Sequence, residues 1–341
     1  MDKRLIWADI VRILAVYFIV VLHVASIPNP SQTNFIYSMG ITIADTCVPL
    51  LVMLSGALLI GRQESYQTFL RKRVSRVVVP WVMWTATFTA IVVYFQARIS
   101  FGTIIHVFHL IFIPFFWFIV LVCSLYAITP ALRIFARSAK TRDIVIVILL
   151  WYAALSLLPT IRNTQAFPLH VGDNVVQLVV NFIGYFLLGY LISKIKLQKK
   201  YVPLIVMLFL LSFLGRSFLE YYSTHSNQQL ISGSGFIDPT LVVFSASFFS
   251  LLYLGEEVYQ KISNSFIRNS LPIISRATLG IYFAHYLFLN REPLPMFIQT
   301  TSLIHISYNI DMFINAFIFY IISLFIILVL VKIPLIKYLV T

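Results

Sequence analysis

Long apolar runs, separated by short polar segments, limit this chain to one class of fold. A helix needs about 20 apolar residues to cross the hydrocarbon core of a bilayer, and ten runs approach or reach that length. Only 11% of the 341 residues are charged, whereas soluble domains carry about 25%. We therefore predict an all-α polytopic membrane protein, a bundle of about ten transmembrane helices at residues 8–28, 41–60, 77–95, 111–130, 144–159, 175–193, 202–220, 239–255, 273–290 and 310–331.

The basic residues indicate how this bundle is oriented. With the N-terminus inside, the inner segments carry 20 of the 25 Lys and Arg residues, the outer segments carry four, and Arg12 lies within the first run. Lys and Arg are enriched in cytoplasmic loops, so we expect both termini in the cytoplasm of a multi-pass cell-membrane protein, in a bacterium the inner membrane. No loop is long enough for a soluble domain, so we expect a single integral-membrane domain over residues 1–341, without a soluble C-terminal domain.

The same bias explains the formal net charge of +13, so nucleic acid is not expected as a partner, whereas membrane lipids are. Cys47 and Cys123 lie in apolar runs without metal-ligand spacing. His106 and His109 are three residues apart but have no further ligands nearby. We therefore expect no metal site.

The first run carries three ionisable side chains, which are rare inside a membrane unless they face an internal cavity. Asp9 and Arg12 are three residues apart and therefore neighbours on a helix. Arg12 and His23 are eleven apart, which brings them within roughly 20° of one face and about 16 Å along the axis. Arg12 could also reach the interface with Asp9 as a surface partner, and a lone histidine is often a core residue. The shared face favours a functional His23, because imidazole suits general base catalysis.

Two further stretches lie on the cytoplasmic side. Ser55-Gly56 ends the second run, where small residues allow close approach of a ligand or simply of another helix. A cluster of four cations precedes the third run. Such clusters usually set topology and contact anionic lipids, but Arg73 and Arg76 could also form a clamp for phosphate groups.

Four polar or aromatic residues are candidates for the acceptor end. His285 falls in the outer half of the ninth run, at a depth similar to His23, and Tyr282 precedes it by three residues. Asp45 falls in the outer half of the second run and is a possible charge partner for either histidine. Trp117 follows an aromatic run, which in membrane helices usually reflects packing. The stretch 184–189 has small residues at helical spacing and is most simply explained by packing.

Six of these stretches together resemble the acyltransferase 3 family of membrane O-acyltransferases. They occur in the family's order along the whole chain, and the chain is similar to the stand-alone members. One departure is Phe115-Phe116, which stands where the family pattern has His-Leu. The matching stretches are Arg12-x10-His23, Met53-Leu54-Ser55-Gly56, Phe69-Leu70-x2-Arg73-x2-Arg76-x3-Pro80, Trp117-Phe118, Gly184-Tyr185-Phe186-x2-Gly189 and Gly280-Ile281-Tyr282-x2-His285.

The resemblance implies transfer of an acetyl or other short acyl group from a cytoplasmic donor, usually acetyl-CoA, to a hydroxyl of a surface or lipid-linked polysaccharide. No tightly bound cofactor is implied. His23 matches the central catalytic residue, assisted by Arg12 and Asp9. Arg73, Arg76 and Ser55 are expected to bind the donor. The expected acceptor-binding residues are Trp117, Tyr282, His285 and Asp45.

Two other functions fit the same features. A basic mouth and an ionisable internal face would also suit a transporter or flippase for a polysaccharide or lipid-linked glycan. A structural subunit of a glycan-assembly complex would leave the ionisable face of the first helix unexplained. Binding of acyl-CoA distinguishes the enzyme from the flippase.

Overall fold

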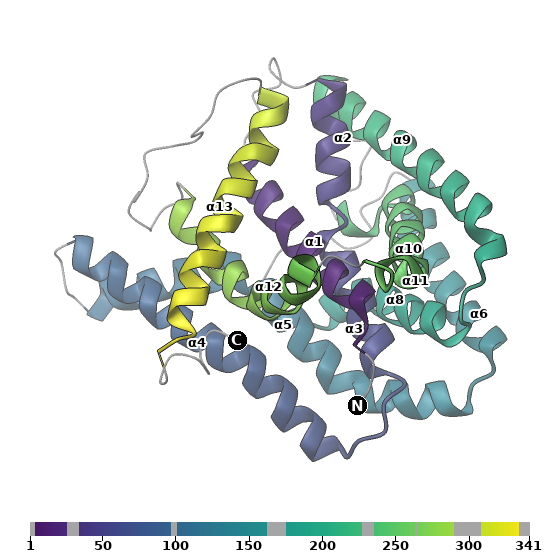
Figure 1. The fold of residues 1–341 in the computed structure, drawn as a ribbon, viewed down its shortest axis with the longest axis horizontal. Helices are drawn as coiled ribbons and strands as arrows, with labels where there is room; N and C mark the ends of the chain where they lie inside the picture. Colours follow the sequence, from purple (N-terminus) through teal and green to yellow (C-terminus); the bar gives the residue numbers. More distant parts are fainter. Residues whose placement is uncertain are drawn as a thin grey trace.

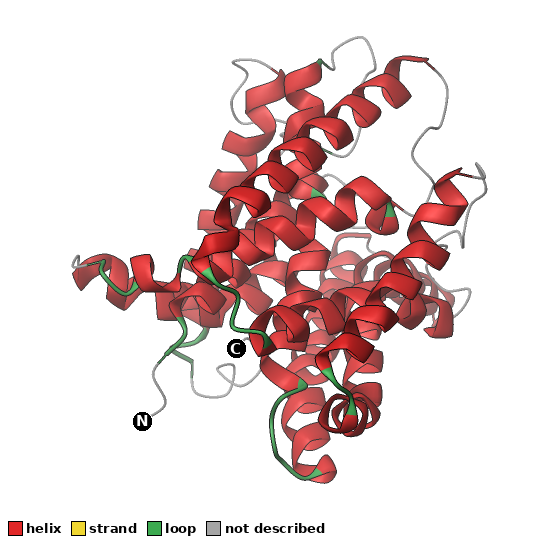
Figure 2. Ribbon diagram, turned by 90° about the vertical axis from the view of Figure 1, so that its right-hand side faces the viewer, coloured by secondary structure: helices red, strands yellow, loops and turns green. Residues whose placement is uncertain are grey.

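A computed structural model describes residues 4–25, 34–96, 101–161, 175–226, 235–262, 265–289 and 308–333. Within these ranges every regular element is helical (Figures 1 and 2), which confirms the all-α class. The longer helices are α1 (Ile6–Val24), α2 (Phe35–Ala44), α3 (Cys47–Leu59), α4 (Tyr66–Gln96), α5 (Phe101–Ser138), α6 (Thr141–Tyr152), α8 (Val175–Lys194), α9 (Val202–Ser226), α10 (Pro239–Leu254), α12 (Ser265–Ala284) and α13 (Tyr308–Leu330).

Short elements extend or connect these helices. A π-helical turn, η2, joins α6 to a final turn of helix, α7, and a 3-10 turn, η5, continues α12. Their bounds and those of the others are η2 (Ala153–Leu157), α7 (Leu158–Ile161), η3 (Lys199–Tyr201), η4 (Gly235–Ile237), α11 (Glu256–Tyr259) and η5 (His285–Phe288).

Nine segments of the described chain are long and apolar enough to cross a membrane, one fewer than the ten expected. The difference is the ninth run. It forms α12, which begins at Ser265, eight residues before the expected start, and is followed by η5. Arg268 and Arg276 lower its apolarity. The second span, Phe35–Leu59, is interrupted between α2 and α3 at Asp45 and Thr46.

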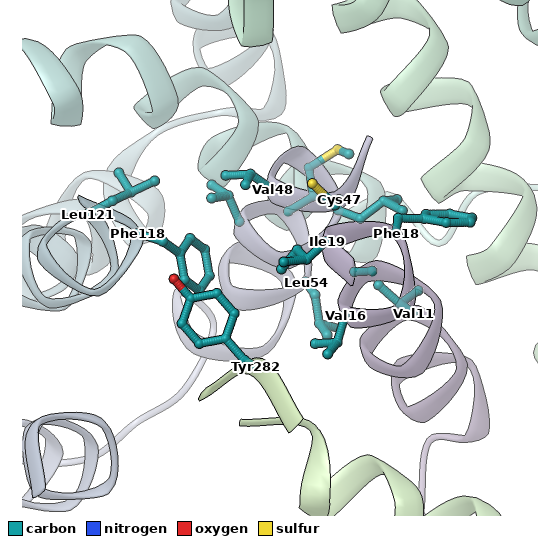
Figure 3. Packing of buried hydrophobic residues seen from close by; sticks show 14 of the residues in the cluster. Val11, Val16, Phe18, Ile19, Cys47, Val48, Leu54, Phe118, Leu121 and Tyr282 are labelled. Carbon is teal, nitrogen blue, oxygen red and sulfur yellow. The ribbon is translucent and has the colours of Figure 1, made fainter. Parts of the chain in front are cut away.

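Helix α1 lies at the centre of the bundle, where it packs against α3, α12, α13 and α2 (Figure 1). Its interior face buries Val11, Val16 and Ile19, and Leu54 of α3 lies beside them (Figure 3). Because α1 is surrounded on several sides, its polar residues are held by protein contacts rather than left facing lipid. This central place is what a helix with an internal polar face requires.

The N-terminus of α1 is capped by a distant residue. Leu5 stands at the N-cap and offers no side-chain acceptor. The carboxylate of Glu256 in α11 instead accepts from the backbone N–H of Trp7 at 2.7 Å and of Ile6 at 3.4 Å. Free N–H groups and the helix dipole make a carboxylate favourable at this position. Glu256 thereby fixes the start of the helix that carries Asp9, Arg12 and His23.

Helices α3 and α8 cross at very short distance. A Cβ on Gly56 would lie 1.8 Å from the Phe186 carbonyl oxygen, and one on Gly189 would lie 1.9 Å from the Met53 carbonyl oxygen. One turn away, a Cβ on Gly184 would meet the Trp151 ring at 1.9 Å. These glycines permit close backbone contact, so the packing interpretation of residues 184–189 is confirmed.

Arg133 of α5 holds the end of α3 in place. Its Nε and Nη2 donate to the Leu59 carbonyl at 3.1 and 2.9 Å, and Nη2 also reaches Glu64 Oε1 at 3.3 Å. The guanidinium carbon lies 4.4 Å from the centroid of the Phe69 ring. A cation at a helix C-terminus satisfies carbonyls that have no partner within the helix. The α3–α4 connection is thus tied to α5.

Candidate active site

Asp9 is the centre of a buried polar cluster at the start of α1. It is 3% exposed and accepts from Arg4 Nε at 2.6 Å, Ser275 Oγ at 2.6 Å and Arg12 Nη1 at 3.4 Å. The expected proximity of Asp9 and Arg12 is therefore confirmed. Asp9 is not a surface partner, however, because α12 covers it through Ser275. Its carboxylate holds the Arg12 guanidinium through this ion pair.

Arg12 faces a cavity of about 260 Å³ between α1, α3, α4, α5 and α12. Four of the predicted site residues line it together, namely Arg12, Ser55, Arg73 and Tyr282. These residues come from four helices. The cavity therefore joins parts of the chain that sequence spacing alone could not bring together.

The cavity is strongly cationic at one end. Arg12, Arg62 and Arg73 line it, and the described lining residues include no Asp or Glu. The Nε of Arg73 is buried without a hydrogen-bond partner. Tyr126 also lines this end and interacts electrostatically with Arg73 and Arg12. Guanidinium groups that converge on a cavity without a lining carboxylate favour an anionic ligand, phosphate above all.

Arg76 does not share this position with Arg73. Residues three apart differ by about 60° around a helix, and here that rotation leaves Arg76 exposed and outside the cavity lining. Arg62, from the connection after α3, is instead the arginine that shares the cavity with Arg73. Sequence reasoning missed Arg62 and Tyr126, because neither lies in a cluster or a periodic pattern that marks a cavity.

Ser55 contacts both its own helix and the cavity. Its hydroxyl donates to the Leu51 carbonyl at 2.9 Å, within α3, and its side chain lines the cavity. Gly56 next to it faces α8 rather than the cavity. Both interpretations of this pair therefore apply: Ser55 faces the cavity, where a ligand could approach, and Gly56 allows the close approach of another helix.

His23 and His285 lie side by side beyond the cavity. Their ring centroids are 5.3 Å apart, and the Tyr286 hydroxyl lies 3.3 Å from His23 Nε2. His285 is fully buried. Its Nδ1 lies 3.1 Å from the Ile281 carbonyl oxygen, and since a carbonyl only accepts, this nitrogen carries the proton. Neither histidine lines the cavity, but the Tyr282 ring lies 6.1 Å from the His285 ring.

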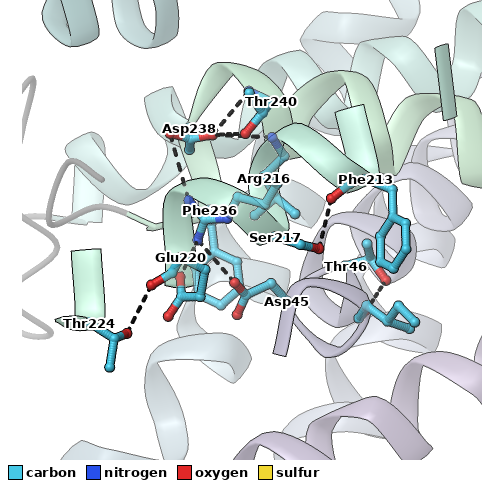
Figure 4. Close-up of polar contacts among 12 residues, drawn as sticks. Asp45, Thr46, Phe213, Arg216, Ser217, Glu220, Thr224, Phe236, Asp238 and Thr240 are labelled. Atoms are coloured by element: carbon cyan, nitrogen blue, oxygen red, sulfur yellow. Dashed lines mark hydrogen bonds and ion pairs between the residues drawn. The ribbon is translucent and has the colours of Figure 1, made fainter. Parts of the chain in front are cut away.

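Asp45, which the sequence offers as a possible charge partner for either histidine, belongs to an ion-pair network around a buried arginine. It pairs with Arg216 Nη2 at 3.1 Å, and Glu220 and Asp238 each lie 3.6 Å from the same guanidinium (Figure 4). Arg216 is 2% exposed. These residues come from α9, the α2–α3 junction and the N-cap of α10, so the network joins three parts of the fold. Nothing in the sequence connects Asp45 with a residue 171 positions away.

Trp117 also lies apart from the cavity lining. Its ring packs against Phe182 at 6.1 Å and Phe236 at 5.6 Å between centroids. This agrees with the packing alternative for the aromatic run. The side chains of Phe115 and Phe116 lie outside the described part of the chain.

The arrangement combines an anion-binding end with an imidazole pair at the opposite end. Within the described residues, no group of three or more His, Cys, Asp or Glu could hold a metal ion. Imidazole side chains suit acid–base and nucleophilic chemistry, and arginines can neutralise a bound anion.

A family model described as an acyltransferase domain matches residues 5–333, nearly the whole chain. No curated protein and no solved structure matches the chain.

Proposed function

Because the chain belongs to the acyltransferase domain family, we propose that this membrane acyltransferase moves a short acyl group, such as acetyl, from acyl-CoA to a hydroxyl of a surface or lipid-linked polysaccharide. The observation that carries the proposal is the cavity. Three arginines and no acid among its described lining face a space that leads toward two histidines. Coenzyme A carries phosphates at one end and the acyl thioester at the other, so its charge distribution matches that of the site.

The donor phosphates bind Arg12, Arg62 and Arg73, and the pantetheine arm points along the cavity toward the histidines. We place the arginine end at the cytoplasmic surface, since the basic segments of the chain favour that orientation. The acceptor approaches from the opposite side, near His23 and His285. Donor and acceptor then meet within the bundle, where water is excluded. In this proposal the 5–333 region works as a single domain of the bacterial inner membrane.

His23 acts as the general base. It takes the proton of the acceptor hydroxyl as the hydroxyl oxygen attacks the thioester carbonyl carbon. The new C–O bond forms as the C–S bond breaks, and the departing thiolate takes up a proton to leave as the free thiol. The Tyr286 hydroxyl beside His23 Nε2 orients the ring. Asp9 orients Arg12 through their ion pair.

Binding of acetyl-CoA to the purified protein tests the donor site. Arg73→Ala removes a guanidinium that faces the cavity, and loss of hydrogen bonds to a charged group should weaken binding about tenfold or more. Arg71→Ala is the matched control, because Arg71 is an exposed arginine of the same helix outside the cavity lining. Equal affinities of the two variants would contradict the proposed donor site.

Acyl transfer to the surface polysaccharide tests the role of His23. His23→Ala should bind acetyl-CoA normally and lose transfer at least about a hundredfold, the usual contribution of a general base. His225→Ala provides the control, since His225 is exposed at the end of α9. The readout is mass spectrometry of the polysaccharide from cells that carry each variant. Full acylation with correctly inserted His23→Ala protein would exclude the mechanism.

The same measurements distinguish the acyltransferase from the flippase alternative. A flippase should neither bind acetyl-CoA nor require Arg73 for the acylation state of the glycan. Specific binding that depends on Arg73 therefore supports the transferase.

A further inference from the structure

Two aromatic rings line the end of the cavity where Tyr282 approaches His285. Phe118 of α5 and Tyr282 of α12 both line the cavity, and their ring centroids are 5.6 Å apart. Both are almost fully buried, at 9% and 6% exposed. Figure 3 shows the two rings facing each other, with the Tyr282 hydroxyl toward Phe118. They close the end of the cavity that lies away from the arginines.

Helix α1 shows independently that the histidines lie beyond this end. Along α1, Arg12 and Val16 both line the cavity and are about 6 Å apart along the axis. His23 follows Val16 by a further rise of about 10 Å and is not in the lining. The axis of α1 therefore runs from the cationic end, past the apolar end, to the imidazole.

Helices α5 and α12 give the same direction. On α5, Tyr126 lies beside the arginines and Phe118 lies two turns away, about 12 Å along the axis. On α12, Tyr282 lines the cavity and is followed three residues later by His285. Three helices thus agree that an elongated ligand anchored at the arginines points its other end at Phe118 and Tyr282.

The rest of the lining near these rings is apolar, and includes Val16, Leu51, Leu54 and Ile119. An acyl chain fits such a surface, and each further methylene that it buries there adds favourable transfer free energy. The two rings limit how many methylenes can enter. Protein interiors are close-packed, so a longer chain requires one ring to move.

We propose that Phe118 and Tyr282 form the floor of the acyl subsite and restrict the donor to short acyl groups. This inference rests on the proposed function, because it takes acyl-CoA as the ligand of the cavity. It adds two residues that determine acyl-chain length, of which Phe118 contributes only a hydrocarbon ring. The thioester then lies beside the two rings, at the end of the cavity nearest the histidines.

Relative binding of acetyl-, butyryl- and hexanoyl-CoA to the purified protein tests the proposal without knowledge of the acceptor. The wild-type protein should bind acetyl-CoA at least as tightly as hexanoyl-CoA. Phe118→Ala should raise the affinity for hexanoyl-CoA relative to acetyl-CoA by about tenfold or more, because the extra methylenes occupy the space of the lost ring. Phe118→Trp should shift the ratio in the opposite direction.

Phe319→Ala is the matched control. It truncates a buried phenylalanine, which stacks on Phe288 and does not line the cavity, so its affinity ratio should equal that of the wild-type protein. If Phe118→Ala does not fold, Phe118→Leu makes a smaller space and should favour butyryl-CoA over acetyl-CoA.

An unchanged ratio in the folded Phe118 variants would overturn the floor while leaving the donor site intact, provided that acetyl-CoA binding still depends on Arg73. A wild-type preference for hexanoyl-CoA would also overturn it. Absence of any acyl-CoA binding would overturn the proposed function and this inference together.

Discussion

Gly56 and Gly189 lie where α3 and α8 approach most closely, and this crossing gives a sharp test of the fold. We consider Gly56→Ala. The added Cβ would lie 1.8 Å from the Phe186 carbonyl oxygen, whereas ordinary contact begins at 3.4 Å. The helices would therefore have to separate by roughly 1.6 Å, because a backbone carbonyl cannot rotate aside as a flexible side chain can. Gly189→Ala strains the same crossing from the opposite helix.

Overpacking of this kind costs about 1–3 kcal/mol. On the scale known for folded domains, this corresponds to a fall of about 2–10 °C in the midpoint of thermal unfolding. Because Ser55 lines the cavity beside Gly56, displacement of α3 should also weaken acetyl-CoA binding. The two substitutions strain one contact surface, so their effects on the unfolding free energy should not be additive.

Thermal unfolding in detergent, followed by circular dichroism, measures the effect. Gly215→Ala is the control, because a Cβ on Gly215 meets nothing within 4 Å and alanine is the better helix former by about 1 kcal/mol. Its midpoint should stay the same or rise. Equal midpoints for Gly56→Ala and Gly215→Ala would refute the close crossing of α3 and α8.

Substitutions in three other contacts can be tested by the same thermal unfolding measurement. Arg216→Ala should destabilise the protein by about 3–5 kcal/mol, since it leaves buried carboxylates without their cation, and Asp45→Asn in addition should recover part of that loss. Glu256→Ala should cost about 1 kcal/mol, because it removes the cap of α1, whereas Glu256→Gln should cost less. Arg133→Lys should cost about 1–2 kcal/mol, since lysine keeps the charge but lacks the planar fork that reaches two acceptors.

Each of these expectations has a clear opposite. A further loss of stability in the double variant would mean that Asp45 does not depend on Arg216. Equal losses for the two Glu256 variants would exclude the capping role. Wild-type stability in Arg133→Lys would show that the charge alone holds the end of α3.

The sequence predicted the membrane helices well because an apolar run of sufficient length has few other folds available. It was weaker at their ends. The helix expected at 77–95 is α4, Tyr66–Gln96, since its charged first turns carry no apolar signal. The ninth run was placed eight residues too late for the same reason, because α12 begins in a polar stretch that includes Arg268.

The site residues that the sequence predicted correctly are those whose residue type is unusual in a membrane helix. Arg12, Ser55, Arg73 and Tyr282 were found because polar or small residues in apolar helices are unusual, and they line one cavity. Phe118 was noted only as part of the Trp117-Phe118 stretch and was given no role, since a phenylalanine in a membrane helix has the same appearance whether it meets lipid, protein or ligand.

Asp45 shows a second limit. Its residue type suggested a charged partner, and it has one, but a charge pattern does not say which of several cations or histidines will be adjacent in space. In the charge count, Arg216 was one of the four basic residues assigned to the outer segments. Only the packing of α9 against α2 and α10 reveals it as the buried partner of Asp45.

The contact of Arg133 with the Leu59 carbonyl has an evolutionary consequence. Through it, α5 is tied to the connection that carries Arg62, so the arginine end of the cavity depends on the C-terminal part of α5. Phe118 lies near the middle of the same helix, just over four turns away from Arg133. On the proposed function, substitutions at Phe118 can therefore accumulate in descendants of this protein and alter the preferred acyl length, while recognition of the donor's phosphates stays under separate selection.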